Sequence, residues 1–375
     1  MCYIVWGSPK GSPFFFNQLA LLPLHFGVSG CVYAMLIVYI CSDQKPLAMK
    51  EIALLIHKDV VLSTISGTLD MLEHTNRFLE ACDKPRAFSV TLVGESASND
   101  LLPVAAPYIK YCRYTDLASA DLIIVPAFFG EPDAIFAEHR ALVDWLGKKH
   151  EQGFEVASLC SGAYFLGEAG LLTGKSCTAH WRDIEDLKRR YPETRFLSRM
   201  VMTDEGGLYT SGGAFSSFHL VLYLIEKYCG REMGIWASKM FSLDMDRESQ
   251  AYFAVFQGQF RHHDEQILTA QDYIDKNYSL PISVEQMAVQ INMSLRNFIR
   301  RFKTATQNTP LEYLQRVRIE AAKKALEVGN PTVTSLMYDS GYQDIKTFRK
   351  VFKRITGLTP IEYRKKYSRT MPVFQ

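Results

Sequence analysis

Two stretches near the end of the chain decide its fold: SLRNFIRRFK at residues 294–303 and DIKTFRKVFK at residues 344–353. In each stretch, phenylalanines recur at helical spacing on one side, and lysines and arginines occupy the opposite side. A short apolar segment and a tight turn precede each stretch, and Asn292 or Gly341 in the turn tolerates positive φ. The pattern predicts two helix-turn-helix units, each with a cationic second helix.

One long helix is expected between the two units. Thr309-Pro310 supply an N-cap and a proline at the first helical position, and Gly329 supplies a stop. Ser294 is expected to cap the second helix of the first unit. Together these signals predict an all-α C-terminal domain over residues 263–369.

Charge is distributed unevenly along the chain. Residues 264–375 hold 18 Lys and Arg against 11 Asp and Glu, a net charge of +7, whereas residues 1–263 carry a net charge of −5. A basic tail on an acidic body indicates a polyanionic partner. A solvated helical bundle with ordinary surface lysines would not need two cationic faces at this spacing.

The C-terminal segment closely resembles the AraC/XylS-type DNA-binding domain. The matching residues are Ser294, Phe298, Arg300, Phe302-Lys303, Pro310, Tyr313-Leu314, Arg318, Ala321-Ala322, Gly341-Tyr342, Phe348, Phe352, Gly357, Thr359-Pro360 and Tyr363-Arg364. Met337 departs from the family, which usually has a small residue there. The resemblance implies sequence-specific binding of double-stranded DNA, with RNA polymerase as a further partner.

Each second helix is expected to enter the major groove. The residues expected to contact bases or nearby phosphates are Arg296, Arg300, Lys346, Thr347 and Lys350. The two arginines are the better candidates for base readout because a guanidinium can pair with guanine through two hydrogen bonds. Arg301, Lys303 and Lys353 are expected near phosphates or solvent.

The rest of the chain predicts a second domain. A length of 375 residues suits two domains, and the eight cysteines show no CxxC spacing. We therefore expect a reducing, cytoplasmic environment, no metal site and no cofactor.

The first 48 residues differ in composition from the remainder of the chain. Leu19–Cys41 is apolar and almost uncharged, and it suits a membrane anchor, a poorly packed extension, or a stretch translated upstream of the true start. Met49-Lys50 directly precedes the first expected strand, so we favour the third interpretation.

From Lys50 the chain alternates between expected strands and helices. The strands are expected at 51–56, 88–93, 121–126 and 154–159, and the helices at 68–81, 133–149 and 161–172. Such alternation predicts a doubly wound parallel sheet over residues 49–240, with ligand chemistry at the carboxyl ends of its strands. An aromatic-rich linker is expected over residues 241–262.

Cys160 is the candidate functional residue of this α/β domain. It ends a strand and begins a helix in ASLCSGA, a turn that exposes a side chain above a sheet. The helix N-terminus is expected to lower the pKa of its thiol. His180 is the candidate imidazole partner, although a buried cysteine and a structural histidine are common without any activity.

Residues 50–230 resemble the class I glutamine amidotransferase-like superfamily in its PfpI-related branch. The matching residues are Asp121, Pro126, Ala157, Cys160-Ser161-Gly162-Ala163, Ala169-Gly170-Leu171-Leu172, Gly174, Thr178 and His180-Trp181. Enzymatic members carry a Glu beside the cysteine, whereas here the matching position falls near Thr64 and residues 58–70 contain no Glu. Phe128 and Phe129 replace a glycine pair and are expected to wall an apolar pocket. The resemblance implies a ligand pocket or residual nucleophile site at Cys160, His180, Ser161 and Phe128.

The two domains in this order resemble bacterial transcriptional regulators whose first domain is a sensor. We therefore expect a homodimeric regulator that responds to a small-molecule effector of unidentified structure. One alternative is a cysteine amidase or hydrolase that carries a DNA-binding tail, and the missing Glu argues against it. Another is a redox sensor in which Cys160 is oxidised to a sulfenic acid.

Overall fold

The computed structural model describes residues 48–96, 109–260 and 262–368. The N-terminal extension, with the apolar run at 19–41, lies outside these residues, so its interpretation stays a prediction. No helix in the described ranges is long and apolar enough to cross a membrane.

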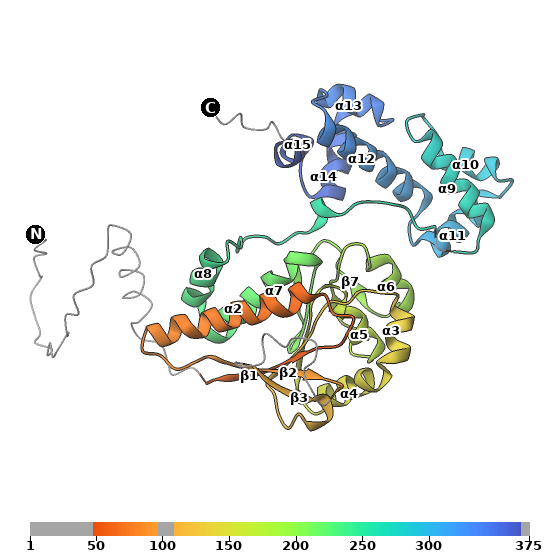
Figure 1. The fold of residues 1–375 in the computed structure, drawn as a ribbon. Helices are drawn as coiled ribbons and strands as arrows, with labels where there is room; N and C mark the ends of the chain where they lie inside the picture. Colours follow the sequence, from red (N-terminus) through yellow and green to blue (C-terminus); the bar gives the residue numbers. More distant parts are fainter. Residues whose placement is uncertain (1–47, 97–108, 261, 369–375) are drawn as a thin grey trace, which may run out of the picture. The chain divides into compact units, whose positions relative to one another are not determined.

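The N-terminal domain is built on a seven-stranded sheet with the order β3-β2-β1-β4-β5-β9-β8 (Figure 1). Its strands are β1 Lys50–Leu55, β2 Phe88–Gly94, β3 Lys110–Arg113, β4 Leu122–Val125, β5 Glu155–Ser158, β8 Met202–Asp204 and β9 Leu208–Ser211. Neighbouring strands are parallel except for β8 and β9, so the predicted doubly wound sheet is confirmed with one antiparallel edge that was not predicted. The strand order reverses between β1 and β4.

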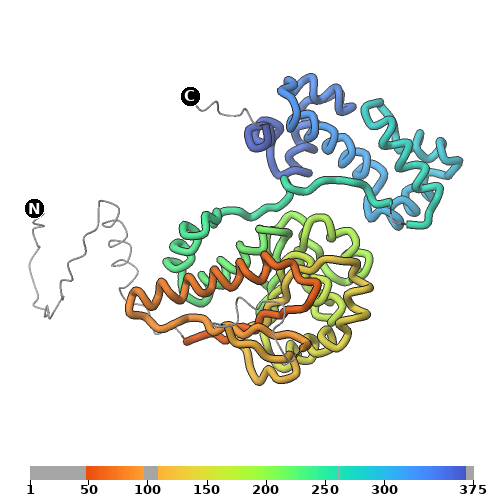
Figure 2. The backbone as a smooth tube through the Cα atoms, in the orientation of Figure 1, coloured from red at the N-terminus to blue at the C-terminus, as the bar shows by residue number. Residues whose placement is uncertain are grey.

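Helices cover both faces of this sheet, as the backbone trace also shows (Figure 2). The helices are α2 Leu62–Ala81, α7 Ser217–Cys229 and α8 Arg231–Met240 on one face, and α3 Pro132–Glu138, α4 Arg140–Glu151, α5 Ala163–Glu168 and α6 Ile184–Arg190 on the other. Side chains of successive strand residues point to opposite faces of the sheet. Ala53 and Leu55 join the core beneath α3, α4 and α5, whereas Ile52 and Leu54 are buried on the opposite side. A separate pair of short strands, β6 Ser176–Cys177 and β7 Arg195–Phe196, completes the domain.

Three predicted helix boundaries were wrong. The expected helix at 133–149 is broken at His139, which ends α3 and begins α4. Helix α2 starts at Leu62 rather than at residue 68. After Cys160 the chain forms a 3-10 turn, and α5 then ends at Glu168. Gly170 follows with a φ of 76°, a conformation that does not continue a helix.

The C-terminal domain contains the two predicted helix-turn-helix units. Its helices are α9 Glu265–Asn277, α10 Val284–Gln290, α11 Leu295–Thr306, α12 Pro310–Val328, α13 Val333–Asp339, α14 Ile345–Thr356 and α15 Pro360–Tyr367. Phe298 and Phe302 pack in one core, and Phe348 and Phe352 pack in the other. Met337 is 2% exposed and packs in the second core, so the departure from the family leaves that packing intact.

Long helix α12 contributes to both cores and links the units. Tyr313 and Leu314 near its start belong to the first core, and Ile319 and Ala322 belong to the second. Thr309 caps α12 with a capping box, as the Thr-Pro signal predicted. Ser294 occupies the N-cap position of α11 but makes no side-chain capping hydrogen bond, which corrects that part of the prediction.

Candidate functional site

The two second helices, α11 and α14, expose the cationic faces that the sequence predicted. On α11, Arg296 and Arg300 are exposed, while Phe298 between them is fully buried. The Arg300 guanidinium donates a 2.9 Å hydrogen bond to Oδ1 of Asn297, one turn earlier on the same helix. This contact limits the side-chain rotamers of Arg300 without removing its remaining donors.

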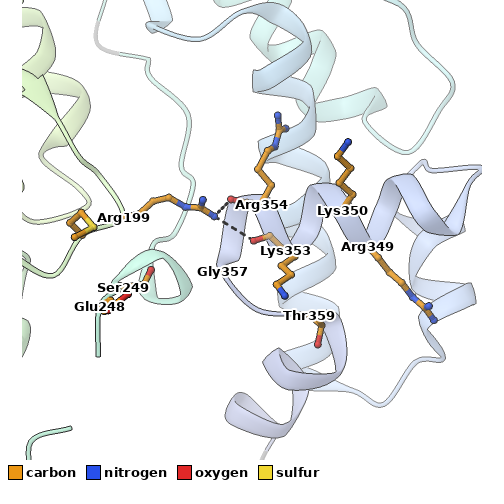
Figure 3. Close-up of a pocket in the computed structure, with 10 residues that line it drawn as sticks. Arg199, Glu248, Ser249, Arg349, Lys350, Lys353, Arg354, Gly357 and Thr359 are labelled. Carbon is orange, nitrogen blue, oxygen red and sulfur yellow. Dashed lines mark hydrogen bonds between the residues drawn. The ribbon is translucent and has the colours of Figure 1, made fainter. Parts of the chain in front are cut away.

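Helix α14 presents a second set of donors on its outer face. Lys346, Thr347 and Lys350 are exposed, and Asp344 caps the helix by accepting a 2.7 Å hydrogen bond from the Thr347 backbone N–H. Hydrogen bonds from Thr347 lower the pKa of Asp344, which keeps the cap ionised. The cationic side chains Arg349, Lys350, Lys353 and Arg354 all project from this helix (Figure 3).

Arg301 differs from its neighbours on α11. Its guanidinium donates to both carboxylate oxygens of Asp264 at 2.6 and 2.9 Å, and to Oε1 of Gln266 at 2.7 Å. Asp264 is the N-cap of α9, so the pair ties α11 to the start of that helix. The guanidinium therefore has partners within the domain, although the Arg301 side chain keeps 31% of its surface exposed.

Cys160 lies at a sharp strand-to-helix turn, as predicted. Its φ is +57°, a conformation that few residues other than glycine adopt. Gly162 is required two residues later, because a Cβ there would lie 2.6 Å from the carbonyl oxygen of Val125 and 2.7 Å from that of Pro126. The Ser211 hydroxyl accepts a 3.3 Å hydrogen bond from the Cys160 backbone N–H.

The expected activation of the thiol was wrong. Cys160 is 8% exposed, and burial raises the pKa of its thiol to about 11. The nearby carboxyl of Asp183 raises it further, whereas a hydrogen bond from the Ala214 backbone opposes the shift. The effect of desolvation on the thiol pKa therefore outweighs the opposite effect of the helix N-terminus. The helix that follows the 3-10 turn, α5, is short.

His180 is placed near the same loops without pairing with the thiol. Its Nδ1 accepts a 3.1 Å hydrogen bond from the Arg182 backbone N–H, and its ring lies against Gly213, where a Cβ would be 2.1 Å from Cδ2. Burial, with Arg182, lowers the pKa of His180 to about 4. Within the described parts of the chain, no hydrogen bond joins His180 to Cys160.

The other two predicted site residues have structural contacts. The Ser161 hydroxyl accepts a 2.9 Å hydrogen bond from the Phe128 backbone N–H, which holds the loop after β4. Phe128 is 6% exposed and packs on Phe165, with ring centroids 5.6 Å apart, so it belongs to the core rather than to an open pocket wall. Thr64, near which the Glu of enzymatic members was expected, donates a 2.7 Å hydrogen bond from its hydroxyl to the carbonyl oxygen of Val61.

Gln250 is a linker residue that sequence analysis missed. It is fully buried, and its Nε2 donates to the carbonyl oxygens of Ala179 at 2.8 Å and Ser198 at 3.2 Å. Its Oε1 accepts a 3.2 Å hydrogen bond from the Gly213 backbone N–H. Gln250 therefore joins the loop that carries His180 to the loop that approaches Cys160.

The linker continues directly into contacts with the C-terminal domain. Lys323 on α12 donates a 2.5 Å hydrogen bond to the carbonyl oxygen of Ala254, and Glu320 accepts a 3.1 Å hydrogen bond from the Phe256 backbone N–H. Lys323 and Glu320 form a buried ion pair at 2.7 Å. Asp183 and Gln250 carried no sequence signal, because neither lies in a motif and both act through segments distant in sequence.

Comparison with known proteins supports this two-domain organisation. Residues 111–227 match the DJ-1/PfpI family, and residues 287–366 match a helix-turn-helix domain family of AraC type. The chain is 25% identical over 261 residues to the HTH-type transcriptional regulator GbdR of Pseudomonas aeruginosa, covering 69% of this chain and 70% of the relative.

Two further regulators are similar over most of their length. CdhR of Pseudomonas aeruginosa is 25% identical, covering 66% of this chain and 73% of that protein. GlxA of Rhizobium meliloti is 23% identical, covering 63% of this chain and 73% of that protein. The chain thus joins a DJ-1/PfpI domain to a C-terminal AraC-type helix-turn-helix domain, the architecture of these HTH-type transcriptional regulators.

Proposed function

We propose that this HTH-type regulator recognises a specific DNA sequence through α11 and α14, and that its DJ-1/PfpI domain is a non-catalytic sensor. The observation that carries the proposal is the pair of exposed cationic faces on two helices whose opposite faces are buried in separate cores. Two such helices in tandem suit neighbouring turns of the major groove.

Five side chains are assigned to the DNA contact: Arg296, Arg300, Lys346, Thr347 and Lys350. Arg296 and Arg300 would read guanine, and the lysines and Thr347 would contact bases or phosphates. Lys303 and Lys353 would position the domain on the phosphate backbone.

Control of DNA binding would run through the linker. A small-molecule effector bound near Cys160 and His180 would move the loops that Gln250 joins, and residues 251–256 would carry that change to α12. Such a switch requires the effector to bind one state more tightly than the other. The regulator would act in the cytoplasm as a homodimer and would contact RNA polymerase.

Capture of genomic DNA fragments by the purified full chain tests the proposal. Wild type should enrich one sequence motif, and Arg296→Ala should weaken or broaden that motif. Lys276→Ala is the matched control, because Lys276 is an exposed cation on α9 paired with Asp272. Absence of any enriched motif, or equal enrichment of the same motif by Arg296→Ala, would contradict the proposal that α11 recognises the DNA sequence.

The enzyme and redox alternatives need a reactive thiolate. Cys160 is buried with a raised pKa, residues 58–70 offer no Glu as an acidic partner, and His180 is hydrogen-bonded to the Arg182 backbone. These three features favour the sensor, because each weakens a step that nucleophilic or redox chemistry requires.

A further inference from the structure

A cluster of two histidines and one aspartate lies at the carboxyl edge of the sheet. His57 and Asp59 follow β1, next to the point where the strand order reverses between β1 and β4. His139 joins them from the break between α3 and α4. Crevices at such reversals are the usual ligand sites of open α/β sheets.

His57 is a buried side chain without a polar partner. It is 3% exposed, and among the described residues neither of its ring nitrogens makes a hydrogen bond. Its ring lies 4.7 Å from the ring of His139, which is 2% exposed. A buried imidazole normally satisfies at least one nitrogen, so the ring nitrogens of His57 are available as ligand atoms.

The neighbours of His57 are arranged as metal ligands are. Nδ1 of His139 lies 2.8 Å from Oε2 of Glu95, which directs the other ring nitrogen, Nε2, toward Asp59 at 3.4 Å. A carboxylate on the outer nitrogen of a histidine is the common support for a metal-binding imidazole. One ligand atom from each of His57, Asp59 and His139 lies within 4.8 Å of the others.

We propose that His57, Asp59 and His139 bind a divalent transition-metal ion of the zinc type, with Glu95 orienting His139. Tetrahedral zinc takes nitrogen and oxygen ligands at about 2.0–2.2 Å, so the ligand atoms would draw together by small side-chain rotations around the ion. Asp59 is partly exposed, so the ion would reach solvent and keep a fourth position for an external ligand. Two histidines and one carboxylate exclude a calcium-type site, which prefers oxygen ligands throughout.

The assignment departs from the expectation of no metal, which rested on cysteine spacing. Asp59 and His139 are 80 residues apart in sequence, and only the fold brings them together. The proposed metal site is independent of the proposed DNA binding, because it lies in the other domain and is tested by metal titration rather than by DNA capture. The DJ-1/PfpI domain would then bind a metal ion in addition to any organic effector.

Metal titration of the purified full chain tests the site. The protein is stripped with a chelator and dialysed, and Zn²⁺ is then titrated by calorimetry and in competition with a chromogenic chelator. Binding of one equivalent is expected, with a rise in Tm. Cobalt substitution should give the visible absorption bands of a tetrahedral nitrogen and oxygen site.

Variants separate this site from adventitious binding. Asp59→Asn, which alters a partly exposed residue, should lower Zn²⁺ affinity at least tenfold, and His57→Ala should abolish the stoichiometric binding. Glu95→Gln should lower affinity by about 10–100-fold while leaving the stoichiometry intact. Each variant is checked for wild-type circular dichroism before titration.

His74→Ala is the matched control, because Nδ1 of His74 bonds to the backbone of its own helix and the residue lies outside the cluster. It should bind Zn²⁺ as wild type does. Absence of stoichiometric binding, or binding unchanged in folded Asp59→Asn, would overturn the assignment. If His57→Ala fails to fold, Asp59→Asn and Glu95→Gln still decide the question.

Discussion

Cys160 combines the backbone geometry of a nucleophile with a buried thiol. The turn with positive φ is present, yet the thiol is 8% exposed and its pKa is raised to about 11. The geometry depends on the local chain, whereas the pKa depends on the groups that surround the sulfur. The two properties therefore need separate tests.

Alkylation of Cys160 by iodoacetamide should be slow at neutral pH. Because the folded pKa is raised, the thiolate fraction at pH 7.5 is small and should grow about tenfold per pH unit toward pH 11. Mass spectrometry of the Cys160 peptide, under native and denaturing conditions, measures the rate. Rapid native labelling at pH 7 would contradict the buried, protonated thiol and would revive the enzymatic and redox alternatives.

Arg300 provides the corresponding prediction for DNA. Arg300→Ala should weaken binding to the preferred site by about 1–3 kcal/mol and relax specificity at one base pair. Fluorescence anisotropy with the captured motif and with single-base variants measures both effects. Arg300→Lys is the companion variant: it retains the charge but not the two-donor geometry, so affinity should partly recover while specificity does not.

At the scale of elements, the C-terminal domain repeats one junction twice. Helices α11 and α14 each end in a residue with left-handed φ, Gln307 at 57° and Gly357 at 81°. Each is followed by a Thr-Pro pair and a capping box, Thr309 with Glu312 and Thr359 with Glu362. The same local hydrogen bonds therefore start α12 after α11 and α15 after α14.

Removing either cap should cost similar stability. Thr309→Ala and Thr359→Ala should each lower the free energy of unfolding by about 1 kcal/mol, because backbone N–H groups at the helix start lose their side-chain acceptor. Chemical denaturation of the full chain measures the change. Thr304→Ala, which removes an exposed hydroxyl from the last turn of α11, is the control and should change stability less; equal losses in all three would argue against capping.

At the scale of the whole molecule, the linker is the feature that joins the two domains. The predicted linker at 241–262 was expected to pack, and the structure places its central part in specific contacts. Gln250 bonds to loops of the sensor domain, and residues 254 and 256 bond to α12. The linker therefore forms hydrogen bonds both with loops of the DJ-1/PfpI domain and with α12 of the C-terminal domain.

Gln250→Ala should loosen the sensor loops. Several buried backbone groups would lose a partner, at a cost of about 1–3 kcal/mol in unfolding free energy. The Cys160 labelling rate should rise, because the loop at residues 213–214 loses its anchor. Gln266→Ala, which removes an exposed glutamine of α9, is the control. An unchanged Cys160 labelling rate in Gln250→Ala would show that the linker does not hold these loops.

Sequence alone determined the features that depend on local spacing. Phe298 with Phe302 and Phe348 with Phe352 mark the inner faces of α11 and α14, and helical periodicity places the cationic residues opposite them. The parallel sheet and the turn at Cys160 also follow from short-range patterns. Such features need no knowledge of which distant residues meet.

Tertiary structure decided the features that depend on distant neighbours. Burial by surrounding segments, with Asp183 nearby, raised the pKa of Cys160 against the expectation from its helix. Arg301 forms an ion pair with Asp264, and Gln250 forms hydrogen bonds with loops of the DJ-1/PfpI domain. Desolvation, ion pairing and the gathering of His57 with His139 arise only when separate segments pack together, because each depends on distances through space rather than along the chain.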